Sequence, residues 1–263
     1  MADKVNASVV KTNFYPHMMV KNNEHPSKLL AFPFLGIIIR FVLLIPVIIY
    51  FWLFSIVFIA YWIVTPFVIV FTGKYWDRAY QFNVGYLKLA TKIALYYSGL
   101  TDKYPGFNRS DNGLFELTID KPEAPSKLLG FPLLGFIIRT ILMIPYSLYQ
   151  TVLGQGSQVA IFISWFAVLF KGKYPESMYE FVRDSIRVSN AMTAYSAYMS
   201  DIYPSFKISM NHKNVKIFLI IAGIILAIAN FTTQPDPDAY NDTSSKESMY
   251  DSTQDSTDTF SDF

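Results

Sequence analysis

The longest apolar run of the chain covers residues 29–71, and Arg40 is the one charged residue within it. A stretch of 18 or more apolar residues is long enough to cross a bilayer as a helix, so this run can supply two spans. A shorter run at 215–231 contains no charge and predicts a C-terminal transmembrane helix over 211–231. The hydrophobic pattern therefore predicts an integral membrane protein.

The sequence repeats itself at a constant offset of 99 residues. SKLLAFPFLGIIIR from Ser27 and SKLLGFPLLGFIIR from Ser126 agree at 11 of 14 positions. The same offset continues without gaps into FTGKY and FKGKY, and then into DKYPGF and DIYPSF. Internal repeats determine the architecture of a chain. Residues 15–110 and 111–210 are therefore predicted to be two tandem membrane repeats in the same orientation.

Each repeat is predicted to contain a transmembrane hairpin of two apolar helices. These helices are expected over 36–53 and 56–71, and over 135–152 and 158–170. The helix over 158–170 would be about 20 Å long, which is shorter than a hydrocarbon core of about 30 Å. The second hairpin would therefore either thin the bilayer or re-enter the side from which it came. A short strand-like segment precedes each hairpin, over 18–21 and 114–120.

A third helix of each repeat is amphipathic, over 77–99 and 175–200. On one face of the second copy, polar residues recur at helical spacing: Glu176, Glu180, Arg183, Asp184 and Arg187. This pattern is typical of a helix that lies in the membrane interface. The alternative is a further span, which these charges would make unfavourable.

The two ends of the chain differ from the repeats in composition. Residues 1–14 are predicted to be a flexible N-terminus. Residues 232–263 contain eight acidic residues and one lysine, together with many Ser and Thr, and are predicted to be a disordered acidic tail. The predicted fold is therefore an all-α membrane protein with two parallel repeats, each with a hairpin and an interfacial helix, then a last transmembrane helix and a tail.

Charge and composition indicate a location and exclude some chemistry. The chain is 52% hydrophobic and 16% charged, against about 25% charged residues in soluble domains. Outside the tail there are 21 basic and 12 acidic residues, and the predicted hairpin turns near Ser55 and Gly154 contain no Lys or Arg. The positive-inside rule then makes the N-terminus cytoplasmic and the tail external. The absence of cysteine excludes disulfides and thiolate metal sites.

Several motifs occur at equivalent positions of the two repeats. They comprise Pro46, Gly73, Tyr75, Tyr104, Pro105 and Phe107 in the first repeat, and Pro145, Trp165, Gly172, Tyr174, Pro175, Tyr203, Pro204 and Phe206 in the second. Gly73 and Gly172 follow an apolar helix, where a left-handed residue ends a helix well. The Tyr-Pro pairs of DKYPGF and DIYPSF predict a helix stop.

The order of these motifs resembles an uncharacterised bacterial membrane family, the domain of unknown function 4389 (DUF4389). The resemblance rests on an arginine followed by Ile-Pro, TGKY, FNVGYLK and LTDKYPGF. It covers residues 15–210. The resemblance implies tandem membrane domains in the bacterial cytoplasmic membrane, with no assigned activity. The first repeat has Pro66 in place of the family's tryptophan and Trp76 in place of its proline, whereas the second has Val182-Arg183-Asp184 in place of Asn-Val-Gly. These complementary departures favour a structural use of the motifs.

The arginine of each repeat is the most notable polar residue of the apolar runs. We expect Arg40 to approach Asp102, and Arg139 to approach Asp201, at the cytoplasmic interface, where each pair would anchor a helix. The alternative is that each guanidinium binds a lipid phosphate, for which its geometry is suited.

The sequence contains no catalytic motif. Its three histidines, His17, His25 and His212, are isolated from one another, so no metal or other cofactor is expected. Three functions stay open, in decreasing order: a non-catalytic scaffold or accessory subunit, a lipid-binding or transport-related protein that uses Arg40 and Arg139, and an enzyme. The expected partners are membrane lipids, above all anionic ones, and membrane proteins or a second copy of the chain, but no nucleic acid.

Overall fold

The structure is a computed structural model that describes residues 9–11, 15–21, 26–32, 35–111, 113 and 115–233. The elements in these residues are β1 (Val9–Lys11), β2 (His17–Lys21), α1 (Leu35–Thr72), α2 (Asp77–Tyr97), β3 (Phe115–Thr118), α3 (Leu134–Lys171), α4 (Glu176–Ser196) and α5 (Lys213–Thr232). Residues up to Ile224 form one compact unit that contains both repeats, and a second unit begins at Ile225. The fold is helical, as predicted, with a small sheet added to it.

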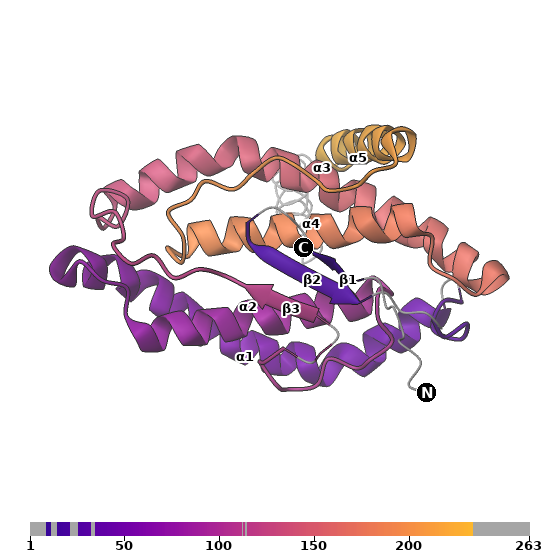
Figure 1. Cartoon of the computed structure of the whole chain (residues 1–263), viewed down its shortest axis with the longest axis horizontal. Helices are drawn as coiled ribbons and strands as arrows, with labels where there is room; N and C mark the ends of the chain where they lie inside the picture. Colours follow the sequence, from indigo (N-terminus) through magenta and orange to yellow (C-terminus); the bar gives the residue numbers. More distant parts are fainter. Residues whose placement is uncertain are drawn as a thin grey trace, which may run out of the picture. The chain divides into compact units, whose positions relative to one another are not determined.

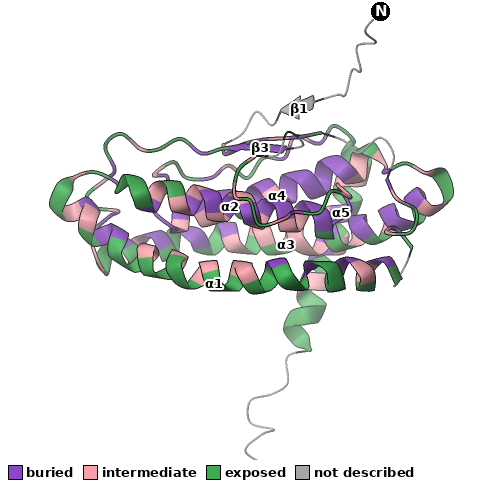
Figure 2. Cartoon of the chain, turned by 90° about the horizontal axis from the view of Figure 1, so that it is seen from below, coloured by how far each residue is buried: buried purple, intermediate pink, exposed green. Residues whose placement is uncertain are grey.

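The first unit is layered. α2 packs along α1, α4 packs along α3, and α2 and α4 contact each other (Figure 1). Antiparallel pairing joins the strands in the order β1-β2-β3. α1 and the sheet lie on opposite sides of α2 (Figure 2). Met18 and Val20 of β2 and Phe115 and Leu117 of β3 are buried, because alternate residues of a strand point to one face.

Reciprocal contacts relate the two repeats by an approximate two-fold rotation. The Tyr75 hydroxyl donates to the Ala197 carbonyl, and the equivalent Tyr174 hydroxyl donates to the Ser98 carbonyl. Near the axis, the Asn190 side-chain amide donates to the Thr91 hydroxyl. These two residues occupy the same position in the two repeats, 99 residues apart. Such isologous contacts arise when two copies of one surface meet each other. The rotation places α1 and α3 on the same side of the α2–α4 layer.

The predicted hairpins are wrong. The segments expected as two helices form one continuous helix of 38 residues in each repeat. The expected first turn lacks a residue that breaks a helix, and the Ser55 hydroxyl instead donates to the Phe51 carbonyl within α1. Gly154 and Gly156 lower the helix propensity of α3 by only about 1 kcal/mol each, which packing can offset. The two alternatives for the second hairpin, that it spans a thinned bilayer or re-enters the side from which it came, both required these turns.

The third helix of each repeat is present, as α2 and α4, but α4 does not lie at the surface. Thirteen of its 21 residues are buried, and its charged face lies in the interior. Asp184 accepts hydrogen bonds from the Ser209 amide and hydroxyl, and Arg187 donates to the Tyr15 and Lys207 carbonyls. Segments from both ends of the first unit therefore cover the face that was expected to meet water and headgroups.

The strand predictions are confirmed by β2 and β3, whereas β1 lies in the range 1–14 that was expected to be flexible. The other residues of that range lie outside the described residues. So does the predicted disordered tail, except for Thr232 and Thr233. The last predicted transmembrane helix is present as α5.

α5 approaches α3 closely at two glycines. A Cβ atom at Gly223 would lie 2.2 Å from the Val152 carbonyl oxygen, and one at Gly156 would lie 2.6 Å from the Leu219 carbonyl oxygen. Small residues permit such backbone contact between helices in a membrane. Among the described residues, α1, α3 and α5 are long and apolar enough to cross a membrane, which indicates membrane association.

Candidate functional site

Arg40 connects four parts of the first repeat. Its guanidinium donates to the Leu30 carbonyl before α1 at 3.2 Å, to the Tyr96 carbonyl of α2 at 2.5 Å, and to the Thr101 carbonyl at 3.2 Å. It also forms an ion pair with Asp102. Asp102 in turn accepts a hydrogen bond of 2.6 Å from the Ser27 amide. The start of α1 is therefore tied to the end of α2.

Arg139 makes the equivalent contacts in the second repeat. It donates to the Leu129, Tyr195 and Ser200 carbonyls at 3.2, 2.6 and 3.1 Å and forms an ion pair with Asp201. Asp201 accepts from the Ser126 amide at 2.7 Å. The structure thus brings together both arginine–aspartate pairs that the sequence predicted.

Neither arginine is available to a lipid phosphate. Arg40 is 2% exposed and Arg139 is 3% exposed, and each uses its donors within the protein. Aromatic rings cover the guanidinium groups, with Tyr96 4.9 Å from Arg40 and Tyr195 4.6 Å from Arg139. A buried charge of this kind needs a partner and full hydrogen bonding. The geometry suits a structural connection between helices, and it disfavours the alternative of headgroup binding.

The glycine and tyrosine that follow each long helix fix the turn into the next one. Gly73 and Gly172 both have φ of 68°, a left-handed conformation that glycine adopts without strain. Tyr75 and Tyr174 then enter the interior and make the reciprocal contacts between repeats. Burial raises the pKa of both phenols above the ordinary value, and a hydrogen bond from Asn83 partly opposes the shift of the Tyr75 pKa.

The Tyr-Pro-x-Phe segments pack along the long helices. Phe107 contacts Tyr50 at a ring distance of 5.3 Å, and Phe206 contacts Tyr149, the equivalent residue, at 5.2 Å. The Tyr203 hydroxyl donates to the Leu142 carbonyl. The remaining prolines and aromatics of the motif take these places: Tyr104 lies against Tyr96, Pro105 and Pro204 are buried, Pro175 precedes α4, and Pro46 and Pro145 lie within α1 and α3.

The repeats fill one equivalent space in two different ways. At one of the two places, the ring of Trp165 from the second repeat lies beside Gly99 from the first, 3.6 Å from where a Cβ atom would be. At the other place, Pro66 of the first repeat stands for the tryptophan, and Tyr198 of the second stands for the glycine. The Tyr198 ring lies 4.7 Å from Arg139. Tyr198 has φ of 62°, which is unfavourable for a residue with a side chain. The departures from the motif at these positions compensate for each other.

The sequence analysis missed the role of the buried charges on α4. Arg183, Asp184 and Arg187 are each 0% exposed. Arg183 donates to Asp184 and to the Ser209 hydroxyl, and burial lowers the pKa of Arg187. The sequence offered no signal of their burial, because charges of both signs along one helix face are also typical of a solvent-exposed helix. They connect α4 to the segments that cover it, and they do not line any cavity described below.

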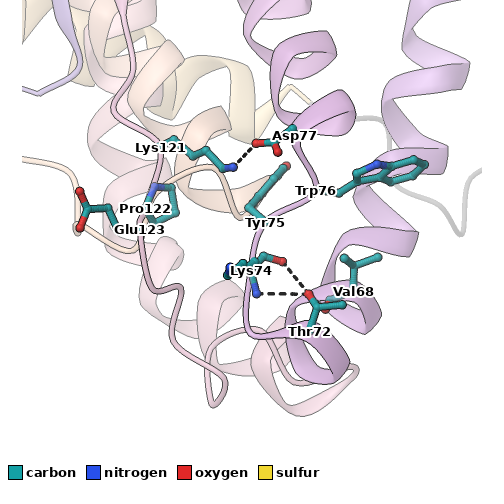
Figure 3. Close-up of a pocket in the computed structure, with 9 residues that line it drawn as sticks. All are labelled: Val68, Thr72, Lys74, Tyr75, Trp76, Asp77, Lys121, Pro122 and Glu123. Carbon is teal, nitrogen blue, oxygen red and sulfur yellow. Dashed lines mark hydrogen bonds and ion pairs between the residues drawn. The ribbon is translucent and has the colours of Figure 1, made fainter.

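A hollow of about 550 Å³ lies beside the turn between α1 and α2 (Figure 3). Lys121 pairs with Asp77 across it, and the backbone amide of Lys74 donates to the Thr72 hydroxyl. With Glu123, two lysines and two carboxylates line the hollow, so their charges cancel and no anion is selected. Within the described ranges no group of three or more His, Cys, Asp or Glu residues is placed to hold a metal ion.

Comparison with known proteins gives a family but no activity. The family model described as Domain of unknown function (DUF4389) matches residues 35–108 and 134–207. No curated protein and no solved structure matches the chain. The two matched ranges cover more than half of the chain and correspond to the two repeats. The chain belongs to the DUF4389 family and carries its domain twice.

Proposed function

We propose that this DUF4389 protein is a non-catalytic scaffold of the bacterial cytoplasmic membrane. Its two repeats form one platform that lies flat in the cytoplasmic leaflet, with α1 and α3 toward the lipid and the sheet toward the cytoplasm. α5 anchors this platform, and the sheet side recruits another protein of a membrane assembly. This arrangement replaces the multi-pass hairpins that the sequence suggested.

The observation that carries the proposal is the uncharged exposed face of α1. Large apolar side chains are exposed from Leu35 at its start to Phe71 at its end, and its single charge, Arg40, is buried. Soluble monomers rarely expose a continuous apolar patch larger than a few hundred Å². An uncharged exposed face along a helix of 38 residues is not typical of them. Exposed charged residues lie instead on the sheet and the loop after it, at Glu116, Asp120 and Lys121. Lipid on one side and water on the other satisfies both faces.

The length of α1 and its contact with α2 favour a flat orientation. At 38 residues, α1 is about 57 Å long, and fitting it across a core of about 30 Å would need a tilt beyond the usual range. α2 packs along α1 and carries Arg78, Lys88 and Lys92. A transbilayer α1 would therefore bring these charges into the hydrocarbon, at a cost of several kcal/mol.

α5 has the dimensions of a true membrane span. Its 20 residues correspond to about 30 Å, the thickness of the hydrocarbon core. The first half of α5 is held against α3 through Leu219 and Gly223, which are its buried residues. A single span of this kind would keep the platform at the membrane even when no partner is bound.

A scaffold accounts for the structure better than the lipid-headgroup alternative. Both arginines of that alternative are engaged by contacts within the protein, so their substitution would destabilise the repeats whether or not a ligand binds. In the first unit, the polar groups of Tyr75, Tyr174 and Asn190 form hydrogen bonds between the two repeats. Its sheet is solvent-exposed on one face, where Glu116 and Thr118 alternate with buried residues. This face is the surface that a cytoplasmic partner would meet.

Single cysteines test the orientation directly, because the native chain has no cysteine. We would place them at Lys28 before α1, at Ile56 in its middle and at Lys74 after it, all of which are exposed. A membrane-impermeant maleimide would be applied to intact cells and to inverted vesicles. A cysteine at Thr118 on the sheet serves as the cytoplasmic control.

A flat α1 predicts that the cysteines at Lys28 and Lys74 react only in inverted vesicles, as at Thr118, and that the cysteine at Ile56 reacts in neither preparation. A hairpin would expose Ile56 in intact cells. A single crossing would place Lys28 and Lys74 on opposite sides. Either of these two results would refute the proposed platform.

A further inference from the structure

A groove runs between α1 and α3 on the side that the proposed function assigns to lipid. Its first part is a hollow of about 480 Å³ between the C-terminal half of α1 and the start of α3, lined by Trp62, Pro66, Leu133 and Tyr198. A second hollow of about 310 Å³ shares Trp62 and Tyr198 and continues along α3 to Ser147. The two hollows therefore adjoin each other at Trp62, Phe136 and Tyr198.

A third hollow of about 230 Å³ extends the groove toward the two-fold axis. It begins one turn further along α3, at Gln150, and one turn back along α4, at Ser189. Neighbouring turns of α3 and α4 therefore line the second and third hollows, and residues of α2 such as Thr91 and Ala94 close the third on its other side. From Phe136 to Gln150 the groove follows α3 for about 20 Å.

The chemistry of the lining changes along the groove. Aromatic and aliphatic side chains surround the first hollow. Hydroxyl and amide groups gather at the third, where the lining includes Gln150, Gln158, Ser185 and Asn190 and no charged residue. Arg139 lines the second hollow, but its donors are already committed to Asp201 and backbone carbonyls. The groove therefore has an apolar end and a neutral polar end.

We propose that this groove binds one uncharged membrane lipid. The hydrocarbon chain lies beside Pro66 and Tyr198, and a head with hydroxyl or ester carbonyl oxygens lies beside Gln150 and Asn190. The inference rests on the proposed function, because lipid reaches the groove only if α1 and α3 face the membrane. Ile63, Phe67 and Leu133, which line the apolar end, are exposed on that side.

The lining selects an uncharged lipid over a phospholipid. Ligand sites fix orientation through a few placed polar groups, and here those groups can donate to or accept from carbonyl and hydroxyl oxygens. A phosphate at the same place would lose its water without gaining a cation, which is unfavourable. Exposed lysines of the unit, such as Lys28, Lys74 and Lys127, do not line this groove.

The two repeats differ at the place where the first hollow opens. At the equivalent place in the other half, Trp165 fills the space beside Gly99. The exchange to Pro66 and Tyr198 leaves the first hollow open on the lipid side. The polar end is also specific to the second repeat, because Phe51 and Ile59 stand in α1 where Gln150 and Gln158 stand in α3.

Photolabelling of the full-length protein in vesicles tests the inference. The two probes would be a diacylglycerol and a phosphatidylglycerol that carry the same diazirine acyl chain. We expect the diacylglycerol to label the groove, in peptides that contain residues 62–67 and 133–147. We expect phosphatidylglycerol to label the outer side of α1, around Ile45 and Ile49, and the groove only at background level.

Two variants and a control connect the labelling to the groove. Pro66→Trp with Tyr198→Gly recreates the filled arrangement of Trp165 and Gly99. Gln150→Leu with Gln158→Leu removes polar groups without adding a charge, and so keeps the test usable if the first variant folds poorly. Each should lower diacylglycerol labelling of the groove by about tenfold, the effect of losing about 1.4 kcal/mol of binding. Ile59→Leu, on the exposed face of α1, should leave it unchanged.

The outcomes separate this inference from the proposed function. Groove labelling that both probes share equally, or that neither double variant lowers, would overturn the inference. If phosphatidylglycerol still labels the outer side of α1 in that case, the flat platform survives and only the lipid site fails. Absence of labelling along the outer side of α1 would contradict the platform itself.

Discussion

The two repeats share one internal framework and differ in what their long helices face. Arg40 and Arg139 make the same hydrogen bonds and the same ion pair with nearly the same distances. α1 nevertheless exposes apolar side chains along its whole length, whereas the middle of α3 carries Gln150, Gln155 and Gln158 and receives α5 at Gly156. The comparison shows that the hydrogen-bonded framework sets the fold of a repeat, while the outer surface is free to take a separate task.

The same comparison explains one departure from the family motif, the replacement of its tryptophan by Pro66 in the first repeat. Trp165 and Gly99 fill one space, and Tyr198 and Pro66 border its equivalent. Each substitution in isolation would create a clash or a cavity, but the pair is compatible. A motif residue that is absent from one repeat therefore indicates a change in its spatial partner in the other repeat.

The largest expected effect is the loss of either arginine. Arg40→Met or Arg139→Met leaves a partly buried aspartate without its cation and removes the donor from several carbonyl groups, so each should lower the free energy of unfolding by about 3–5 kcal/mol. Lys88→Met breaks the more exposed pair with Asp111 and should cost less than about 1 kcal/mol. Chemical denaturation in detergent measures all three. If one repeat tolerates the loss and the other does not, the equivalence of the two frameworks is wrong.

The next effect concerns the compensating exchange. Trp165→Ala should cost about 3–5 kcal/mol through a cavity, and Gly99→Tyr should cost about 1–3 kcal/mol through overpacking. The double variant should cost less than the sum, because the new tyrosine occupies space that the tryptophan vacates. A double-mutant cycle on thermal unfolding measures this coupling. Strict additivity would show that the two residues do not share one space.

The contact that distinguishes the second repeat should have a smaller effect. Gly223→Val places a side chain against the Val152 carbonyl and should lower the free energy of unfolding by about 1–3 kcal/mol. Ile224→Val, at an exposed position of the same helix, should change it by less than about 0.5 kcal/mol. Circular dichroism melts compare the two variants. Equal effects would mean that α5 does not dock through its glycine.

The smallest effects are expected for the reciprocal tyrosines. Tyr75→Phe should cost about 1 kcal/mol, and Tyr174→Phe should cost less because its hydrogen bond is longer, 3.5 Å against 3.2 Å. Burial raises the folded-state pKa of both phenols above the ordinary 10.0. Their contribution is therefore fully present below about pH 10 and is lost as the pH rises toward the folded-state pKa. The double Phe variant should show a shallower loss of stability above pH 10, and an unchanged slope would contradict this.

Several features could be predicted from the sequence because their signals are local or repeated. The offset of 99 gave the two repeats, the Gly-Lys-Tyr motifs gave the helix ends, and alternation gave β2 and β3. The pairs Arg40–Asp102 and Arg139–Asp201 followed because an arginine in an apolar run needs a nearby acid, and each repeat offered one at the same spacing.

The continuous helices α1 and α3 and the burial of α4 could not be predicted, for a physical reason. A helix that packs on a protein layer along one side and exposes apolar side chains along the other has the composition of a transmembrane span, so α1 was predicted as two helices. The charged face of α4 looked solvent-exposed because the residues that cover it, such as Tyr15 and Ser209, lie far away in the sequence. Only the tertiary structure shows that α1 packs on α2 along one side and that distant segments cover the charged face of α4.

The depth of α1 in the bilayer tests the central claim most directly. Spin labels would be placed singly at successive positions along Leu35–Thr72 in reconstituted vesicles, and accessibility to oxygen would be compared with accessibility to a water-soluble nickel complex. A flat helix predicts an oscillation with a period of about 3.6 residues around a constant mean depth from Leu35 to Phe71. A mean depth that rises to one maximum in the middle and falls toward both ends would show that α1 crosses the bilayer, and would contradict the account.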